Sequence, residues 1–578
     1  MLPSHIWTLW HCLRAKPEAS CPGPETGADA VRNWTIRYWN SFSTTGLLIG
    51  TLFFAFSLTP TLIPRNYITQ GVLSGCSAAA GYGIGFFLRW LWRYLELPEL
   101  EARTLRLGKL AAAFACGIVG LIFLWRAAEW QNSIRVVMGL DPLDTAHPLE
   151  VGGIALITFA VIVALARLFK LTLVFISERL RRYVPTRVSY VIGTTLSVLL
   201  FWSVADGVIF RYALRAADSS FQRLDALMPP ETEQPADPGK TGSAGSLVHW
   251  QDLGRMGRSY IASAPTAAQI EAVTGRPAKE PIRVYVGLQS AETPQQRARL
   301  AFEELKRAGG FDRAALVIIT PTGTGWVDEQ GIDPVEFLHD GDIASVAAQY
   351  SYLASWLSLL VEPGYGAEQA RALFAEVYGY WRTLPKDGRP KLYLYGLSLG
   401  ALSSELSNEL FEVLGDPYQG ALWVGPPFPS RIWNAITADR NPGTPAWLPE
   451  FRDGSYVRFT AQKNALAMPG ATWGPLRVVY LQYASDPITF FDPHAFYSEP
   501  DWMKAPRGPD VSPDLRWYPV VTFLQLLLDV AMATTSPIGH GHVYAAEHYI
   551  DAWLEVTGVG WPAADVARLK QHFIDARK

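Results

Sequence analysis

The sequence predicts an N-terminal α-helical transmembrane bundle of about five spans, followed by a C-terminal α/β domain with a mainly parallel sheet. Two observations carry this prediction. Apolar segments of membrane-spanning length crowd into the first 215 residues, and short apolar strands alternate with amphipathic helices after residue 247. The length of 578 residues, which is too great for a single hydrophobic core, also favours separate domains.

The apolar segments lie near residues 43–64, 68–90, 108–126, 150–169 and 188–210. Each is close to the roughly 20 residues that a helix needs to cross a bilayer. In the second segment, Gly81 and Gly85 have the spacing of small residues that allows two helices to approach closely. The domain limits that follow are an N-terminal arm at 1–42, a transmembrane domain at 43–215, a linker at 216–246 and a C-terminal domain at 247–578.

The loops between these segments differ in charge. Lys and Arg are frequent in the N-terminal arm and in the loops near 89–109 and 167–187, and they are rare in the other two loops. Because basic loops stay in the cytoplasm, five spans place the C-terminal domain on the opposite side. We therefore expect a multi-pass protein of the cytoplasmic membrane that contacts the lipid bilayer and has an extracytoplasmic C-terminal domain.

Composition and motifs argue against several functions. A formal net charge of −3 provides no basic field for nucleic acid. The chain has no H-E-x-x-H motif and no Cys/His cluster with ligand spacing, so we expect no metal site. Gly323 and Gly325 start a G-x-G motif, but Asp328 stands where its third glycine would be, so we expect no dinucleotide cofactor. The oligomeric state stays open.

In the C-terminal domain, the pattern predicts strands at 281–288, 314–321, 391–396, 420–427 and 476–484. Helices are expected at 293–310, 343–363 and 518–533. The last of these carries Gln525 and Asp529 on one face, and we expect it to be a core helix. In parallel sheets the functional residues lie beyond the carboxyl ends of the strands, and the candidates are sought there.

The stretch KLYLYGLSLGALSSE, residues 391–405, joins a predicted strand to a predicted helix through Gly-x-Ser-x-Gly. This pattern is typical of a nucleophile elbow, a tight turn in which Gly396 and Gly400 remove side chains that would collide with the strand and helix. The turn then exposes the hydroxyl of Ser398 at the edge of the sheet. The backbone N–H of Leu399, at the start of the helix, is an expected oxyanion donor.

A serine hydroxyl needs a base to take its proton and an acid to orient that base. Behind an elbow of this kind, the acid and then the histidine follow the serine in the chain. His540 and His542 lie in a Pro/Gly loop before an amphipathic helix, and His542 is favoured because it is closer to that helix. Asp486 follows the strand at 476–484 and is the favoured acid, with Asp492 as the alternative.

A second oxyanion donor is expected from the loop after an earlier strand. Thr322, Gly323 and Thr324 follow the strand at 314–321 and offer backbone N–H groups in an open, Gly-rich turn. Together with Leu399 they form the predicted oxyanion hole.

The C-terminal domain resembles the alpha/beta-hydrolase superfamily. The whole chain resembles a bacterial membrane family that joins an N-terminal multi-span region to an alpha/beta-hydrolase catalytic domain. The matching stretches extend over most of 247–578 and are PTGTGWVD, AAQYSYLASWLSLLVEP, YGLSLG, YLQYASDPITFF, LRWYPVVTFLQLLLD and PIGHGHVYAAEHYIDAW. The resemblance implies hydrolase chemistry, with Ser398 as nucleophile, Asp486 as acid and a histidine of the G-H-G-H pair as base.

From these residues we expect a membrane-anchored serine hydrolase that cleaves an apolar, lipid-like acyl ester through an acyl-enzyme. Four tryptophans near predicted strand ends and loops fit such a substrate, namely Trp326, Trp423, Trp433 and Trp473. Two alternatives stay open: an acyltransferase that uses the same triad, and a non-catalytic membrane protein for transport or sensing. The sequence does not identify the acyl group or the leaving group.

Overall fold

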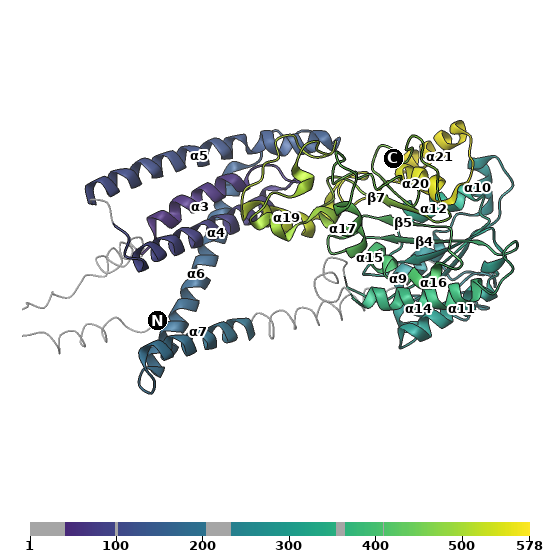
Figure 1. The fold of residues 1–578 in the computed structure, drawn as a ribbon, viewed down its shortest axis with the longest axis horizontal. Coiled ribbons are helices and arrows are strands. Elements are labelled where there is room, and N and C mark those ends of the chain that lie inside the picture. The colour runs from purple at the N-terminus through teal and green to yellow at the C-terminus, as the bar shows by residue number, and fades with distance from the viewer. Residues whose placement is uncertain (1–40, 99–101, 204–232, 354–363, 409, 578) are drawn as a thin grey trace, which may run out of the picture. The chain divides into compact units, whose positions relative to one another are not determined.

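The computed structural model describes residues 41–98, 102–203, 233–353, 364–408 and 410–577 (Figure 1). By packing, the chain divides into two compact units, formed by Met1–Ala55 with Ser77–Ile122 and by Phe56–Cys76 with Phe123–Lys578. The N-terminal arm and the first part of the predicted linker lie outside the described residues. The division does not coincide with the predicted domain limits, because it groups Phe56–Cys76 and the chain from Phe123 onward with the C-terminal domain.

In the first unit, helix α3 (Thr44–Ser57) packs closely on α4 (Tyr67–Tyr94) through glycines. A Cβ added to Gly85 would lie 2.7 Å from the Cα of Gly46, and one added to Gly81 would lie 2.8 Å from the carbonyl oxygen of Ile49. Any side chain at these positions would force the helices apart. The close approach predicted from the spacing of Gly81 and Gly85 is therefore confirmed.

Three helices in the described part of the chain are long and apolar enough to cross a membrane: α4, α5 (Ala102–Val137) and α6 (Pro148–Leu180). This is fewer than the five predicted. Helix α3 has 14 residues and α7 (Thr186–Trp202) has 17, which gives lengths of about 21 and 26 Å against a hydrocarbon core of about 30 Å. Residues 204–210 of the fifth predicted span lie outside the described residues.

The first predicted span is wrong beyond Ser57, where α3 ends. Pro60 and Pro64 keep the following chain out of a helix. Leu62 and Ile63 are fully buried and belong to the hydrophobic core of the C-terminal domain. The hydropathy of Leu62 and Ile63 indicates that they are buried away from water, but it does not distinguish burial in a protein core from burial in lipid.

The second unit contains a seven-stranded sheet in the order β1-β3-β2-β4-β5-β7-β6, and all its strand pairs are parallel. The mainly parallel sheet is therefore confirmed. The strands are β1 (Ile282–Val286), β2 (Ala315–Thr320), β3 (Ile343–Ala348), β4 (Lys391–Leu397), β5 (Gly420–Val424), β6 (Val457–Thr460) and β7 (Arg477–Leu481). Almost all their residues are buried, as expected where helices cover both faces.

Helices α12 and α20 pack on one face of this sheet, and α11, α14 and α15 pack on the other (Figure 1). The α-helices of the domain are α9 (Gly254–Ala262), α10 (Ala267–Thr274), α11 (Pro294–Arg307), α12 (Glu329–Leu338), α14 (Gly364–Trp381), α15 (Leu399–Glu405), α16 (Leu410–Val413), α17 (Arg431–Ala438), α18 (Pro487–Phe490), α19 (Val521–Ala531), α20 (Ala546–Thr557) and α21 (Ala563–Asp575). Short 3₁₀ turns complete it: η2 (Trp250–Leu253), η3 (Leu288–Ser290), η4 (Gly310–Asp312), η5 (Pro493–Phe496), η6 (Asp501–Met503) and η7 (Ala533–Thr535).

Two predictions about this domain are corrected. The helix predicted at 343–363 begins as strand β3, because burial inside the sheet overrides the local helix preference of its alanines. Residues 354–363 lie outside the described residues. The end of the predicted linker is packed, since Glu304 accepts hydrogen bonds from the hydroxyl of Ser246 and the N–H of Leu247 at 2.7 and 2.9 Å.

Candidate active site

Ser398 lies in the sharp turn between β4 and α15 and has a backbone φ of 58°. This conformation is strained for a residue with a side chain, so its surroundings must hold it. A Cβ added to Gly396 would lie 2.4 Å from the backbone of Gly400, and one added to Gly400 would lie 2.1 Å from the carbonyl oxygen of Thr320. Both glycines are therefore required for the steric reason that a nucleophile elbow predicts.

The carboxylate of Asp486 is fully buried just beyond β7. It caps α18 by accepting the N–H of Ile488 at 2.8 Å, and it accepts the hydroxyl of Tyr544 at 2.7 Å. It also lies 2.7 Å from the imidazole Nδ1 of His542. A carboxylate held by several donors is fixed in place and can orient an imidazole.

His542 lies in the loop before α20, and backbone hydrogen bonds hold this loop. The N–H of His542 donates to the carbonyl of Ala533 at 3.2 Å, and the N–H of Gly541 donates to Ser485 Oγ at 2.8 Å. The other ring nitrogen of His542, Nε2, is buried without a hydrogen-bond partner among the described residues. One nitrogen is thus oriented by Asp486, and the second is available to a proton donor.

Gly425, directly after β5, leaves room for the imidazole of His542. The N–H of Ser398 donates at 2.9 Å to the carbonyl of Val424, the last residue of β5. A Cβ added to the next residue, Gly425, would lie 2.8 Å from Cε1 of His542 and 3.0 Å from Oδ2 of Asp486. Because Gly425 has no side chain, the imidazole lies over the end of β5, next to the strand that leads into Ser398.

The alternative acid and base have other surroundings. Asp492 lies 2.8 Å from Nδ1 of His494, an exposed side chain. The Nδ1 of His540 is buried and has no hydrogen-bond partner within the described chain. The structure therefore brings Asp486 together with His542, and it does not bring Asp492 to either histidine of the G-H-G-H pair by a hydrogen bond.

The loop after β2 folds back on itself. The N–H and the hydroxyl of Thr322 both donate to the carbonyl of Trp326, at 3.0 and 3.2 Å. The N–H of Thr322 is therefore engaged inside the loop, which corrects its prediction as an oxyanion donor. Gly323 and Thr324 lie at the tip of this turn and stay predictions. Leu399 is the first residue of α15, where an N–H has no acceptor within the helix.

Two protein-family models match the chain. Residues 282–569 match the model described as alpha/beta-hydrolase family, and residues 58–265 match the model described as alpha/beta-hydrolase family N-terminus. The chain belongs to the alpha/beta-hydrolase family. The resemblance predicted from the sequence is therefore confirmed. Neither the curated proteins nor the solved structures gave a match.

Three residues that shape the alpha/beta-hydrolase site were not predicted from the sequence as site residues: Gly425, Tyr544 and Asp328. Gly425 could have been noticed as a glycine directly after a predicted strand. Tyr544 lies two residues beyond His542 in the chain, but nothing in the pattern pairs it with Asp486. Burial and the Asp486 carboxylate raise the pKa of Tyr544 well above its ordinary value, so its hydroxyl stays a donor.

Asp328 is a second buried carboxylate close to this alpha/beta-hydrolase site. It caps α12 and accepts the hydroxyl of Tyr549 at 2.9 Å. Burial raises the pKa of Asp328 to about 7, while the Tyr549 hydroxyl and, more weakly, His542 oppose the rise. In the sequence, Asp328 stands out only as the residue that breaks a G-x-G motif.

The remaining predictions about the site concern metals and tryptophans. The described residues contain no group of three or more His, Cys, Asp or Glu side chains that could hold a metal ion. Trp423 and Trp433 are buried and donate hydrogen bonds to other core side chains, so their contacts are those of core residues. Trp326, in the loop after β2, is 40% exposed, and of these three tryptophans it is the most accessible to a substrate.

Proposed function

We propose that the chain is a membrane-anchored serine hydrolase that cleaves an apolar acyl ester through an acyl-enzyme. One observation carries the proposal: a strained Ser398 lies beyond β4 and a buried Asp486–His542 pair lies beyond β7, with Gly425 at the end of the intervening strand β5. A serine, a histidine and an acid in this order supply a nucleophile, a base and an orienting group.

In the proposed reaction, Nε2 of His542 takes the proton of the Ser398 hydroxyl as Oγ attacks the acyl carbonyl carbon. The N–H of Leu399 stabilises the negative charge on the carbonyl oxygen. The bond to the leaving alcohol then breaks, and His542 returns the proton to that alcohol. Water, activated by the same imidazole, attacks the acyl-enzyme and releases the free acid.

A cavity lined in part by aromatic side chains supports an acyl substrate. It has a volume of about 480 Å³, and its lining includes Phe428, Trp433, Phe490, Phe491 and Trp502. Phe428 also packs against the buried cluster of Leu399 and Leu402, in the helix that follows Ser398. A cavity of this size accommodates a small ligand. Its aromatic side chains can contact hydrocarbon, and Arg440, Asp492 and Asp501 make another part of its lining charged.

The test of this function is ester hydrolysis by the full chain in detergent micelles. We expect p-nitrophenyl octanoate to be cleaved with a kcat/KM at least about 10-fold higher than p-nitrophenyl acetate, because each buried CH₂ contributes about 0.8 kcal/mol. The Phe428→Ala variant should lower kcat/KM for octanoate more than for acetate. No turnover of either ester would contradict the proposal and favour a non-catalytic protein.

We also propose that the alpha/beta-hydrolase domain lies outside the cytoplasm, and that the shorter helices α3 and α7 cross the cytoplasmic membrane in addition to α4, α5 and α6. The contacts of the domain support this orientation. Ser512 lies 2.6 Å from Ser133 near the end of α5, and Asp529 binds the chain that follows α3. Both segments belong to the loops that are poor in Lys and Arg, which are the loops expected outside.

Cysteine labelling tests this orientation. In a background with the native cysteines replaced, we expect a membrane-impermeant maleimide to modify Ser498→Cys in sealed, right-side-out spheroplasts. Ser498 is an exposed residue of the alpha/beta domain. The control is Tyr183→Cys, which is 84% exposed in a strongly basic loop and should react only after the membrane is broken. The reverse pattern would place the domain in the cytoplasm.

A further inference from the structure

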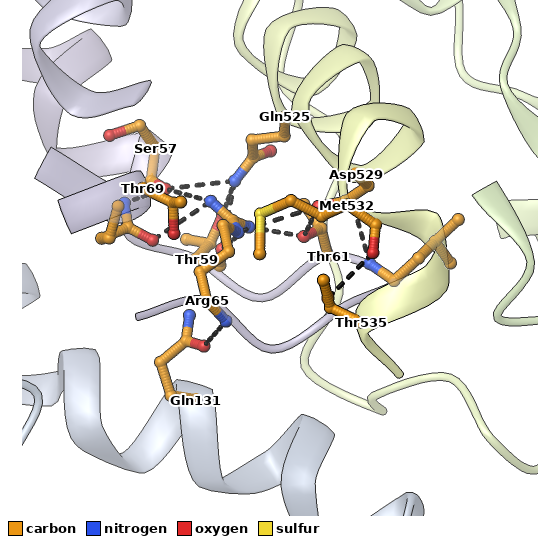
Figure 2. Close-up of polar contacts among 12 residues, drawn as sticks. Ser57, Thr59, Thr61, Arg65, Thr69, Gln131, Gln525, Asp529, Met532 and Thr535 are labelled. Carbon is orange, nitrogen blue, oxygen red and sulfur yellow. Dashed lines mark hydrogen bonds and ion pairs between the residues drawn. The ribbon is translucent and has the colours of Figure 1, made fainter. Parts of the chain in front are cut away.

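Helix α19 binds a chain segment that comes directly after the first apolar helix (Figure 2). The carboxylate of Asp529 accepts the hydroxyl of Thr61 at 3.2 Å and the N–H of Leu62 at 3.1 Å. One helical turn earlier, the amide of Gln525 donates to the carbonyl of Thr59 at 3.0 Å. All five residues are almost completely buried. The face of α19 that the sequence assigned to the core thus binds backbone from the membrane region.

A buried arginine completes this contact (Figure 2). Nε of Arg65 lies 3.8 Å from Oδ1 of Asp529, with both side chains 0% exposed, and its guanidinium also donates to the Thr61 hydroxyl. Burial raises the pKa of Asp529 to about 6, and the charge of Arg65 opposes that rise. The backbone N–H of Arg65 donates to Gln131 on α5 at 2.8 Å. Removing one partner of such a pair leaves an uncompensated buried charge.

Apolar contacts hold the same segment. Leu62 and Ile63 are part of the hydrophobic core that surrounds the sheet. The ring of Phe56 stacks on Tyr518, just before α19, with centroids 4.2 Å apart and planes 5° apart. The segment is therefore built into the alpha/beta domain rather than resting on its surface.

Helix α19 in turn supports the loop of His542. The carbonyl of Asp529 accepts the N–H of Met532 at 3.0 Å, and the carbonyl of the next residue, Ala533, accepts the N–H of His542 at 3.2 Å. Gly541 is packed tightly against the same stretch, since an added Cβ would lie 2.2 Å from Ser536 Oγ. A shift of α19 would therefore move the backbone that holds the imidazole.

We propose that residues 57–65 brace the histidine loop, and that Thr61, Arg65 and Asp529 are positioning residues that place His542 against its acid. This inference rests on the proposed function, because it assigns His542 a role in turnover. It means that the alpha/beta domain is fully active only while the chain between α3 and α4 is seated on α19. The membrane region then contributes to the active site and is not only an anchor.

The test compares Asp529→Asn and Thr61→Val in the full chain, in micelles, on p-nitrophenyl octanoate. Both changes keep the shape of the side chain and weaken the contact between α19 and residues 57–65. We expect kcat to fall by about 10- to 100-fold, because displacing a catalytic group by about 1 Å has an effect of this size. KM should stay within about twofold, because the substrate contacts are unchanged. If Asp529→Asn does not fold, Thr61→Val still tests the inference.

The matched control is Glu304→Gln. Glu304 is also fully buried, and it also accepts a hydroxyl and a backbone N–H from a distant segment, but that segment is Ser246 and Leu247 and not the brace. We expect its kcat to stay within about twofold of the native value. An equal loss of kcat in the control and the brace variants, or native kcat in folded Asp529→Asn, would overturn the inference.

Hydrogen exchange separates this inference from the proposed function. Amides of residues 532–543 should exchange at least about 10-fold faster in Asp529→Asn and Thr61→Val than in the native chain, and at the native rate in Glu304→Gln. This readout requires no turnover. Faster exchange in a chain that cleaves no ester would support the structural coupling and reject the hydrolase. Unchanged exchange in an active hydrolase would reject the brace.

Discussion

Ser398→Ala is expected to abolish ester cleavage while leaving the fold intact. Loss of a triad nucleophile lowers turnover by about 10⁴- to 10⁶-fold, because the acyl-enzyme cannot form. The change removes one hydroxyl from a turn whose backbone is held by the glycines on either side and by the hydrogen bond to Val424. The melting temperature should therefore stay within a few degrees of the native value. The measurement is kcat for p-nitrophenyl octanoate together with thermal unfolding.

Ser403→Ala is the matched control for this variant. Ser403 lies in the same helix, is 1% exposed, and has an Oγ without a hydrogen-bond partner in the described chain. Its replacement should leave kcat within about twofold, because no proposed step uses it. If Ser398→Ala keeps native activity, the serine hydrolase proposal fails. If both variants lose activity together with stability, the loss comes from packing of the helix and not from a missing nucleophile.

His542→Ala should lose turnover as severely as Ser398→Ala, by about 10⁴- to 10⁶-fold, and His540→Ala by no more than about 10-fold. The physical reason is the contact with the acid, since Nδ1 of His542 lies 2.7 Å from Asp486. The measurement is kcat for both variants under the same conditions.

The two single variants also decide between the two histidines. Reversed severities would make His540 the base, and they would leave the elbow and its nucleophile in place. His494→Ala serves as a further control, because His494 is exposed and lies beside Asp492. A large loss of activity in that variant would favour Asp492 as the acid.

The parts of the fold that were predictable are those in which local pattern and tertiary burial agree. The strand before the elbow, the following helix and the two glycines belong to a steric motif, so the sequence alone specifies their arrangement. The parallel sheet follows from the same agreement, because most residues of its strands are apolar. Strand β3 was predicted as a helix, because its alanines favour a helix and form a strand only where the sheet buries them.

The site and the membrane region were less predictable, because they depend on contacts between distant residues. Nothing in the sequence pairs Asp486 with Tyr544, or Gly425 with His542, since these pairs form only when the loop before α20 folds over the ends of β5 and β7. The Thr322 prediction failed because the loop satisfies that N–H internally. The first span was extended too far because Leu62 and Ile63 are buried in protein and not in lipid.

We propose that Ser398 is a nucleophile activated by the elbow and by the Asp486–His542 pair. The most direct test is to locate a covalent adduct on the chain. The full chain is treated with a fluorophosphonate probe, digested, and analysed by peptide mass spectrometry. We expect one modified site, Ser398, with modification lost in Ser398→Ala and strongly slowed in His542→Ala. A native chain that stays unmodified, or an adduct on any other serine, would contradict it.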